Sequence, residues 1–378
     1  MGLVPIIEDL AKKKKSDSVT QKPVQQPIVS DRIFVNLKPI EEKMTEQKKV
    51  EVAHLDFAAD TQVETHIFGV GGCGKVAAIR YSKTNHCTKN ITTIDTSGVT
   101  DEIPGVDSIR ISGLNGSGKL RKHNAEHITN FVTDYTSKTS FSPVNVIIMS
   151  FSGGSGSVIG PLLISEIMRQ KKIAIVIGVI DTDSEIDTIN AMNCLRTVDS
   201  MTKERKGYLP AILFDNNKGR HVVDRGIDTM MVNLDAILDI PYIGLDTQDR
   251  IKFLNPQVFD GVIGGVKLLN ITKQPDGKWE DIGLIIPDET HEKIDSAILI
   301  SHTDNHLTLT NRCVATFRGY YVKEGENVVA EIGYQIPEKL IKGLNSDINS
   351  FRSTISKKQT EIESERTIGE KTDNGLIL

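Results

Sequence analysis

The chain has 378 residues, enough for two ordinary domains with cores of their own. Its 38% apolar and 25% charged residues are typical of a soluble globular protein, and its net charge of −5 argues against a surface that wraps nucleic acid. Aromatic residues make up only 5%, which argues against an aromatic platform for sugars or bases. No run of about 18 apolar residues occurs, so no transmembrane helix is expected.

The four cysteines are far apart and form no CxxC pair: Cys73, Cys87, Cys194 and Cys313. This spacing favours reduced thiols over a disulfide framework or a zinc site. The first 15 residues, MGLVPIIEDLAKKKK, place their positive charges after the apolar run, which is the reverse of a signal peptide. We therefore expect a cytoplasmic protein.

Residues 1–60 read as a flexible N-terminal extension, with one short element expected at RIFVNL. The basic run Lys12–Lys15 is more typical of a solvated tail than of a docking site for a partner, although both interpretations stay open.

From Thr65 onward, short apolar runs alternate with glycine-rich turns and helical segments. The runs predict strands at Thr65–Val70, Asn90–Asp95, Val144–Phe151, Ile173–Ile180 and Ala211–Phe214. They are continuously apolar, which indicates strands covered on both faces in a parallel sheet. With helices between them, they predict an α/β fold with a Rossmann-like, doubly wound sheet over residues 61–243. Helices are expected from Lys75 and from Gly160.

A long central helix is predicted from Gly219 to Asp239, because six apolar residues recur at three- and four-residue spacing. Pro241 ends it. The runs GLIIP, SAILIS, RCVATFRGYYV and NVVAEIGYQI then predict a second, smaller α+β domain over residues 244–336, with a mixed or antiparallel sheet.

Residues 337–378 predict a C-terminal helix that starts at Pro337, followed by a flexible tip. A narrow apolar stripe runs along it, made of Ile341, Leu344, Ile348, Phe351 and Ile355. The stripe fits packing on the parent domain and docking on a neighbouring subunit equally well.

Three glycine-rich loops carry the functional argument. Loop one is Gly69–Lys75, loop two is Gly113–Lys119 and loop three is Ser152–Ser157. Loop one alone matches a dinucleotide site, with GxGxxG after a strand and Asp95 about 20 residues later. That interpretation leaves loops two and three unexplained.

Loops one and two also match the GxxxxGK of a Walker A motif. Both then fail in the same way, because Val76 and Leu120 stand where Ser or Thr should bind magnesium. A third interpretation uses all three loops, whose backbone N–H groups and following helices would hold the phosphates of a nucleoside triphosphate.

Loop three resembles the [SAG]GG[ST]G[SAT]G signature of the tubulins, departing from it at Val158. The segment Gly71–Gly74 resembles the first phosphate loop of FtsZ. The chain is therefore identified as similar to the tubulin/FtsZ superfamily of GTPases over about residues 65–335. The GSGK of loop two and the long terminal helix look most like the phage and plasmid tubulins of the PhuZ/TubZ group.

The resemblance implies GTP and Mg²⁺ as ligands, and filaments in which a loop after the central helix completes hydrolysis on the next subunit. The matching acids are Asp246 and Asp249, with Gly244 where the family often has Asn. An acidic turn that caps the next helix is the plainer interpretation of this pair.

The implied nucleotide-binding residues are Gly71, Gly72, Cys73, Gly74, Asp95, Thr96, Gly116, Ser117, Gly118, Lys119, Gly153, Gly154, Ser155, Gly156, Ser157, Glu185, Asn216 and Asp224. Among them Asn216 and Asp224 would read the guanine, and Glu185 would reach the ribose.

The expected function is a GTPase that forms head-to-tail filaments and positions phage or plasmid DNA or particles in a bacterial cytoplasm. An adaptor or DNA-bound partner would bind the basic run or the C-terminal tail. Two alternatives stay open: a Rossmann-type NAD-dependent enzyme, and a GTP-binding structural protein that does not polymerise.

Overall fold

The computed structural model describes residues 63–84, 89–97, 103–122, 124–240, 242–259, 262–274, 282–287, 293–302, 307, 309, 312–321 and 327–366. All of these residues fall in one compact unit. The basic run Lys12–Lys15 and the element predicted at RIFVNL lie outside the described residues. So does the flexible tip predicted after the last helix.

A single sheet organises the fold. Its strands are β1 (Thr65–Val70), β2 (Asn90–Asp95), β3 (Val106–Arg110), β4 (Val144–Ser150), β5 (Ile173–Ile180), β6 (Tyr208–Asp215), β7 (Tyr242–Ile243), β8 (Gly265–Gln274), β9 (Ile294–Ser301), β10 (Cys313–Tyr321) and β11 (Asn327–Tyr334). They pair in the order β3-β2-β1-β4-β5-β6-β8-β11-β9-β10-β7.

From β3 to β8 every pairing is parallel, as predicted for the first part of the chain. Beyond β8 the sheet is mixed, because β11 lies antiparallel to β8 and β9 while β9 and β10 run parallel. The sheet is continuous from β6 to β8, so the predicted border at residue 243 does not coincide with a break in strand pairing. The division into domains stays a prediction.

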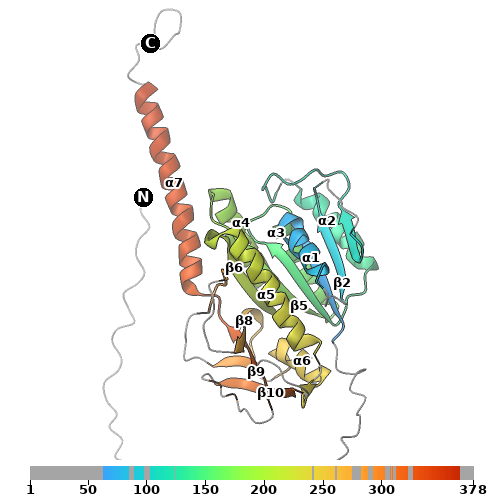
Figure 1. Cartoon of the computed structure of the whole chain (residues 1–378). Coiled ribbons are helices and arrows are strands. Elements are labelled where there is room, and N and C mark those ends of the chain that lie inside the picture. Colours follow the sequence, from blue (N-terminus) through green and yellow to red (C-terminus); the bar gives the residue numbers. More distant parts are fainter. Residues whose placement is uncertain are drawn as a thin grey trace, which may run out of the picture. The chain divides into compact units, whose positions relative to one another are not determined.

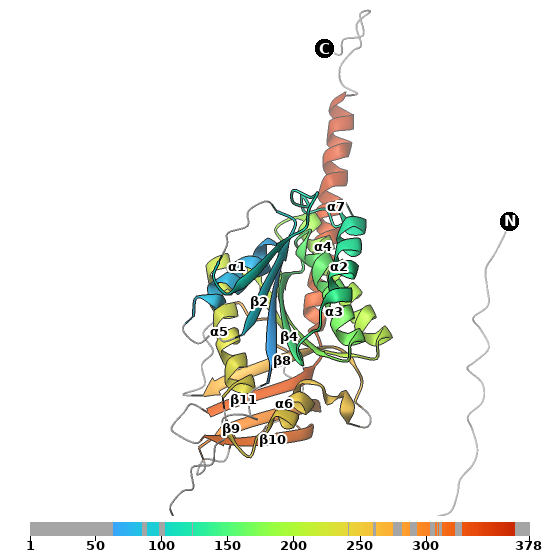
Figure 2. The same cartoon turned by 90° about the vertical axis from the view of Figure 1, so that its right-hand side faces the viewer.

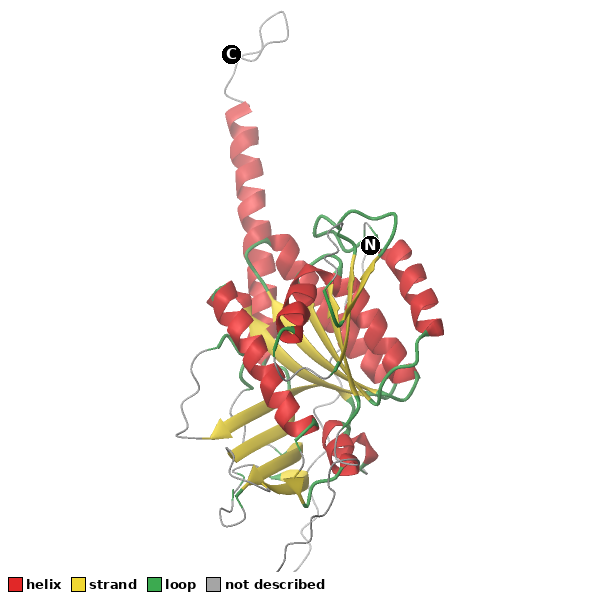
Figure 3. Cartoon of the chain, turned by 45° about the vertical axis from the view of Figure 1, so that its right-hand side comes forward, coloured by secondary structure: helices red, strands yellow, loops and turns green. Residues whose placement is uncertain are grey.

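Helices cover both faces of the parallel part. The α-helices of the described chain are α1 (Gly71–Ser82), α2 (Ala125–Lys138), α3 (Gly156–Arg169), α4 (Glu185–Glu204), α5 (Arg220–Leu238), α6 (Thr247–Leu254) and α7 (Glu338–Arg366). Of these, α6 packs on β9 and β10 of the mixed part, and α7 packs on α4. Figure 2 shows α1 and α5 on one face and α2, α3 and α4 on the other, so the predicted doubly wound arrangement is confirmed. Figure 3 shows the same layers coloured by type of element.

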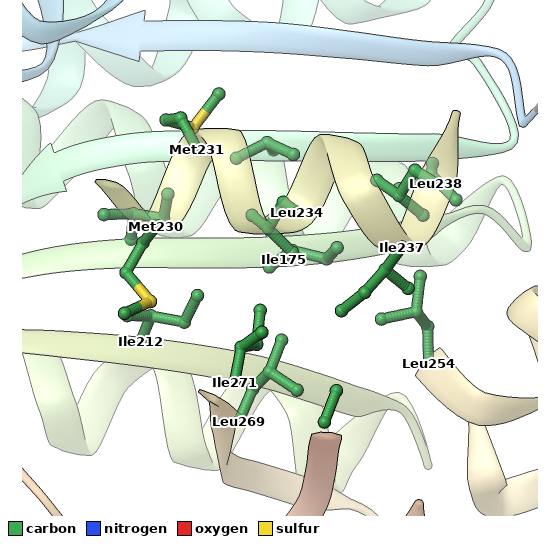
Figure 4. Packing of buried hydrophobic residues seen from close by; sticks show 14 of the residues in the cluster. Ile175, Ile212, Met230, Met231, Leu234, Ile237, Leu238, Leu254, Leu269 and Ile271 are labelled. Carbon is green, nitrogen blue, oxygen red and sulfur yellow. The ribbon is translucent and has the colours of Figure 1, made fainter. Parts of the chain in front are cut away.

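The central helix α5 packs as its spacing predicts. Figure 4 shows that Met230, Leu234 and Ile237 lie over side chains of the sheet, among them Ile212 on β6 and Ile271 on β8. All five residues are at least 99% buried. Full burial of an aliphatic side chain stabilises the folded state by about 1.5–3 kcal/mol, so this seam holds the helix in a fixed place along the sheet.

Three sequence predictions need correction. GLIIP forms no strand, because Leu284 makes only an isolated bridge to Phe214 and Gly283 has a φ of +77°. The strand β8 was not predicted. Helices α1 and α3 begin at Gly71 and Gly156, four residues before the predicted starts, so glycines of loops one and three form first helical turns.

The C-terminal helix α7 divides into two parts. Leu340, Ile341, Leu344 and Ile348 pack against the core cluster on the side of α4. From Arg352 to Gln359 every side chain is exposed, and this part of α7 extends away from the sheet in Figure 1. Within the described ranges, no helix is long and apolar enough to cross a membrane.

Candidate nucleotide site

The three loops meet at one edge of the sheet. Loop one follows β1, loop two follows β3, and loop three follows β4. Because these strands run parallel, their carboxyl ends lie at the same edge, where open α/β sheets bind ligands. The structure therefore brings together the loops that the sequence singled out.

Loops one and three touch through their glycines. Gly71 has a φ of +67°, and a Cβ placed on it would lie 2.7 Å from the Gly156 nitrogen. A Cβ on Gly74 would overlap the carbonyl oxygen of Ile148 on β4. Glycine is thus required for backbone to pack on backbone here. This contact aims the N-termini of α1 and α3 at a shared space, as phosphate binding needs.

Loop two is held against loop three. A Cβ on Gly154 would overlap the Ser117 hydroxyl. The Asn190 amide on α4 donates to the carbonyl oxygens of Lys119, at 2.8 Å, and of Ser152, at 3.1 Å. Asn190 is therefore a clamp between two loops. The sequence carries no signal for it, since only the fold brings α4 to this place.

A salt bridge that the sequence of loop two does not predict holds the side chain of Lys119. Its Nζ atom lies 2.7 Å from the buried Asp187 carboxylate, and this hydrogen bond raises the pKa of the ammonium group. The Lys119 backbone has a φ of 63°. Its side chain is 60% exposed, and its backbone carbonyl is linked to loop three through Asn190.

Asp95 and Thr96 hold the turn after β2. The Asp95 carboxylate accepts from the Thr96 N–H at 2.7 Å and from the Ser97 hydroxyl. The Thr96 hydroxyl lies 2.5 Å from that of Ser155 in loop three. Thr96 thereby joins the second strand to loop three, and Asp95 acts as a turn-forming acid.

Two of the residues predicted to contact base and ribose, Asn216 and Glu185, lie in the segments that follow β6 and β5. Asn216 donates to the Asp181 carboxylate at 3.0 Å, and Asp181 contacts Ser152 of loop three. Glu185 opens α4 with a carboxylate oxygen 3.7 Å from Arg352 on α7. These contacts put Asn216 beside loop three, whereas the contact of each residue with a nucleotide stays a prediction.

Asp224 joins α5 to α1. Its carboxylate lies 3.0 Å from Arg80 Nη1 and 3.8 Å from Arg220 Nε. Burial of the Cys73 thiol raises its pKa most, and the negative charge of Asp224 raises it further, to about 11. Cys73 of loop one and Asp224 therefore border the same part of the site.

The Cys73 thiol should react slowly with alkylating reagents. An unperturbed thiol with a pKa of 9.0 reaches its full rate above pH 9, whereas the rate at Cys73 should keep rising about tenfold per pH unit up to pH 10. Mass spectrometry of the Cys73 peptide after iodoacetamide treatment measures this. A plateau at pH 9 in folded protein would contradict the burial argument.

Asp246 and Asp249 lie at the other edge of the sheet. The Asp246 side chain accepts from the Asp249 N–H at 2.8 Å, and Asp249 accepts from the Asp246 N–H at 3.4 Å. The pair thus forms a capping box on α6. The last turn of α5 lies at the same end of the fold, because the N–H of Val63, two residues before β1, donates to the carbonyl oxygen of Leu238.

Next to this pair, Arg250 is fully buried. Its Nη2 donates to the Ile240 carbonyl at 2.6 Å, and its guanidinium lies 5.6 Å from the Tyr242 ring centroid. Burial lowers the pKa of Arg250. The residue fixes α6 to the end of α5, so the position of the two acids is set by the core.

In the part of the chain that the structure describes, no group of three His, Cys, Asp or Glu residues could hold a metal ion.

Comparison with known proteins gives the same assignment as the fold. No family model matches the chain. The chain is 30% identical over 118 residues to a phage tubulin-like protein of Pseudomonas phage phiKZ, which takes in 31% of this chain and 34% of that protein. The chain thus aligns with about a third of the length of this curated relative.

Solved structures match over most of the chain. A protofilament structure of TubZ from bacteriophage PhiKZ matches with a TM-score of 0.66 and 18% identity, covering 84% of this chain and all of that one. The phage tubulin PhuZ with GDP gives a TM-score of 0.66 at 15% identity, with the same coverage. TubZ of Clostridium botulinum phage c-st gives 0.58 at 16% identity, covering 78% of this chain and 99% of that one. The chain therefore has the tubulin/FtsZ fold, and the predicted likeness to the phage tubulins is confirmed.

Proposed function

We propose that the chain binds GTP across loops one, two and three and assembles head to tail, so that Asp246 and Asp249 of one subunit complete hydrolysis on the next. The observation that carries this proposal is the placement of loops and acids at opposite edges of one sheet. The likeness to filament-forming phage tubulins supports it.

The two parts of the site are too far apart to meet within one chain. Helix α5 has 19 residues and spans about 28 Å between the end of β6 and the approach to α6. Its packing against β5, β6 and β8 fixes that separation. A second copy shifted along the strands would bring its α6 beneath the loops of the first.

The residues fit a triphosphate at the loops. Loops one and three offer backbone N–H groups where side chains are excluded, and Lys119, whose side chain is 60% exposed, adds an ammonium group that also pairs with Asp187. Mg²⁺ bound through the phosphates would supply charge neutralisation. The carboxylates of Asp246 and Asp249 would orient the attacking water and accept its proton.

The likeness to phage proteins supports a proposal for the wider role. We propose a filament that positions phage or plasmid DNA or particles in the cytoplasm of a bacterial host. A partner would bind through Lys12–Lys15, which lies outside the described residues, or through the C-terminal segment.

Sedimentation of the purified full chain tests the proposed function. With GTP or a slowly hydrolysed GTP analogue and Mg²⁺, we expect protein in the pellet and filaments in electron micrographs. NAD should leave the protein in the supernatant. Binding and turnover of NAD without pelleting by GTP would contradict the proposal and favour the dinucleotide interpretation of loop one.

A truncation tests the exposed part of α7. Removing residues 352–378 leaves the packed residues Leu340, Ile341, Leu344 and Ile348 in place, so the melting temperature should stay within about 2 °C of wild type. If the exposed half docks on a neighbouring subunit, the critical concentration for assembly should rise about tenfold. Unchanged assembly would exclude this role for the exposed half.

A further inference from the structure

Two basic turns lie side by side at the amino ends of β5 and β6. The turn between α3 and β5 carries Arg169, Lys171 and Lys172, and the turn between α4 and β6 carries Arg205 and Lys206. All five line one cavity of about 580 Å³, next to Asn255 and Gln257, which follow α6. We call these five cations the basic edge.

Most of this charge is not neutralised. Arg169 pairs with Glu166 at 2.7 Å, and Arg205 donates to the Ser165 hydroxyl. For Lys171, Lys172 and Lys206, no ion pair with a carboxylate occurs among the described residues. Glu204 is the remaining acid in these turns and is exposed. The basic edge therefore keeps a positive surplus.

Lys171 and Lys206 occupy backbone positions that favour glycine. Their φ values are 61° and 52°, and each follows the C-cap residue of a helix, Gln170 or Arg205, in a Schellman turn. The closing bonds run from Lys172 N–H to Ile167 O at 3.1 Å and from Gly207 N–H to Thr202 O at 2.7 Å. A lysine or arginine within the last helical turn would also interact favourably with the helix dipole, and it would not need a positive φ. A side chain with a Cβ is less favourable than glycine at such a φ, so the lysines point to a use for the charge.

The opposite ends of the same strands are acidic. Asp181 and Asp183 follow β5, and Asp215 ends β6. Asp183 is exposed, whereas Asp187 pairs with Lys119 and Glu185 faces Arg352. Asp181 also contacts loop three, so this acidic loop, residues 181–184, lies beside the candidate nucleotide site.

We propose that the basic edge of one subunit docks on the acidic loop of the next copy of this chain. The basic edge lies at the amino end of β5, and the acidic loop follows its carboxyl end. A second subunit shifted along that strand therefore brings the opposite charges face to face. The same shift carries α6 toward the loops of the neighbour. This contact rests on the proposed head-to-tail assembly. It adds the charged residues that set how neighbouring subunits align and which ends meet.

Charge reversal with rescue tests the contact. We compare Lys171→Asp/Lys206→Asp, Asp183→Lys and the triple variant, because Asp tolerates a positive φ and preserves the turns. The control is Arg196→Glu, at an exposed position halfway along α4. The critical concentration for pelleting with a slowly hydrolysed GTP analogue is measured for each, along with GTP binding by dispersed protein.

The double lysine variant and Asp183→Lys should each raise the critical concentration about tenfold, and the triple variant should return to within about threefold of wild type. Arg196→Glu should assemble like wild type, and the double lysine variant should keep the wild-type GTP affinity. Wild-type levels of assembly in the double variant, or no rescue in the triple variant, would overturn this contact alone. A wild-type chain that never pellets with GTP would instead remove the assembly and this contact together.

Discussion

Replacing Asp249 by Asn should lower GTP turnover per subunit about a hundredfold while GTP affinity stays at the wild-type value. The amide keeps an oxygen that can accept the Asp246 N–H, so the capping box on α6 survives while the charge is lost. Asp246→Asn should act in the same direction. Filaments of both variants should persist longer, since their nucleotide is consumed slowly.

Alanine at the same positions provides the matched comparison. Asp246→Ala removes the N-cap as well as the charge, and should lower the free energy of unfolding by about 1 kcal/mol relative to Asp246→Asn. Phosphate release and fluorescent GTP binding measure the two effects separately. If Asn variants turn over GTP like wild type, Asp246 and Asp249 serve only as a helix cap.

Gly74→Ala should lower the free energy of unfolding by about 3 kcal/mol and abolish GTP binding, because the new methyl group would overlap the Ile148 carbonyl oxygen. Either α1 or β4 must move, and both carry phosphate loops. The control is Gly72→Ala, two residues earlier in the same helical turn, where a Cβ meets no atom within 4 Å.

The control should be as stable as wild type or slightly more so, since alanine favours a helix over glycine. Chemical denaturation followed by circular dichroism compares the two variants. Equal stability of Gly74→Ala and Gly72→Ala would contradict the close packing of α1 against β4 at Gly74.

The sequence predicted the parts of the fold that depend on local pattern. β5 is eight continuously apolar residues, and α5 repeats apolar residues on one face, so both could be read without tertiary information. β3, with its polar VDSIR, lacks such a signal, and in β8 the adjacent Leu268 and Leu269 break the alternation of apolar and polar residues. Their pairing depends on neighbouring strands.

The sequence predicted which loops form the candidate site. It did not predict most of the contacts between their residues. Glycines in three loops pointed to phosphate binding, but the link from Thr96 to Ser155 spans 59 residues and that from Lys119 to Asp187 spans 68. No spacing rule covers such distances. Asp187 and Asn190 were missed for this reason, although Ser184 and Asp187 form a recognisable helix cap.

The acidic pair shows a different limit. Its two interpretations, helix cap and catalytic pair for a neighbour, are compatible, because a cap fixes the positions of both carboxylates and does not prevent their contact with a second subunit. The sequence alone presented them as competitors. The fold adds that this cap lies across the length of α5 from the loops, which makes a second subunit necessary for any role in hydrolysis.

The dependence of GTP turnover on protein concentration tests this split site most directly. Phosphate release per subunit should be close to zero in dilute protein and rise steeply above the concentration at which filaments pellet. The loss in Asp249→Asn should then appear only above that concentration. A turnover per subunit that is constant from dilute to concentrated protein would contradict completion of the site by a neighbour.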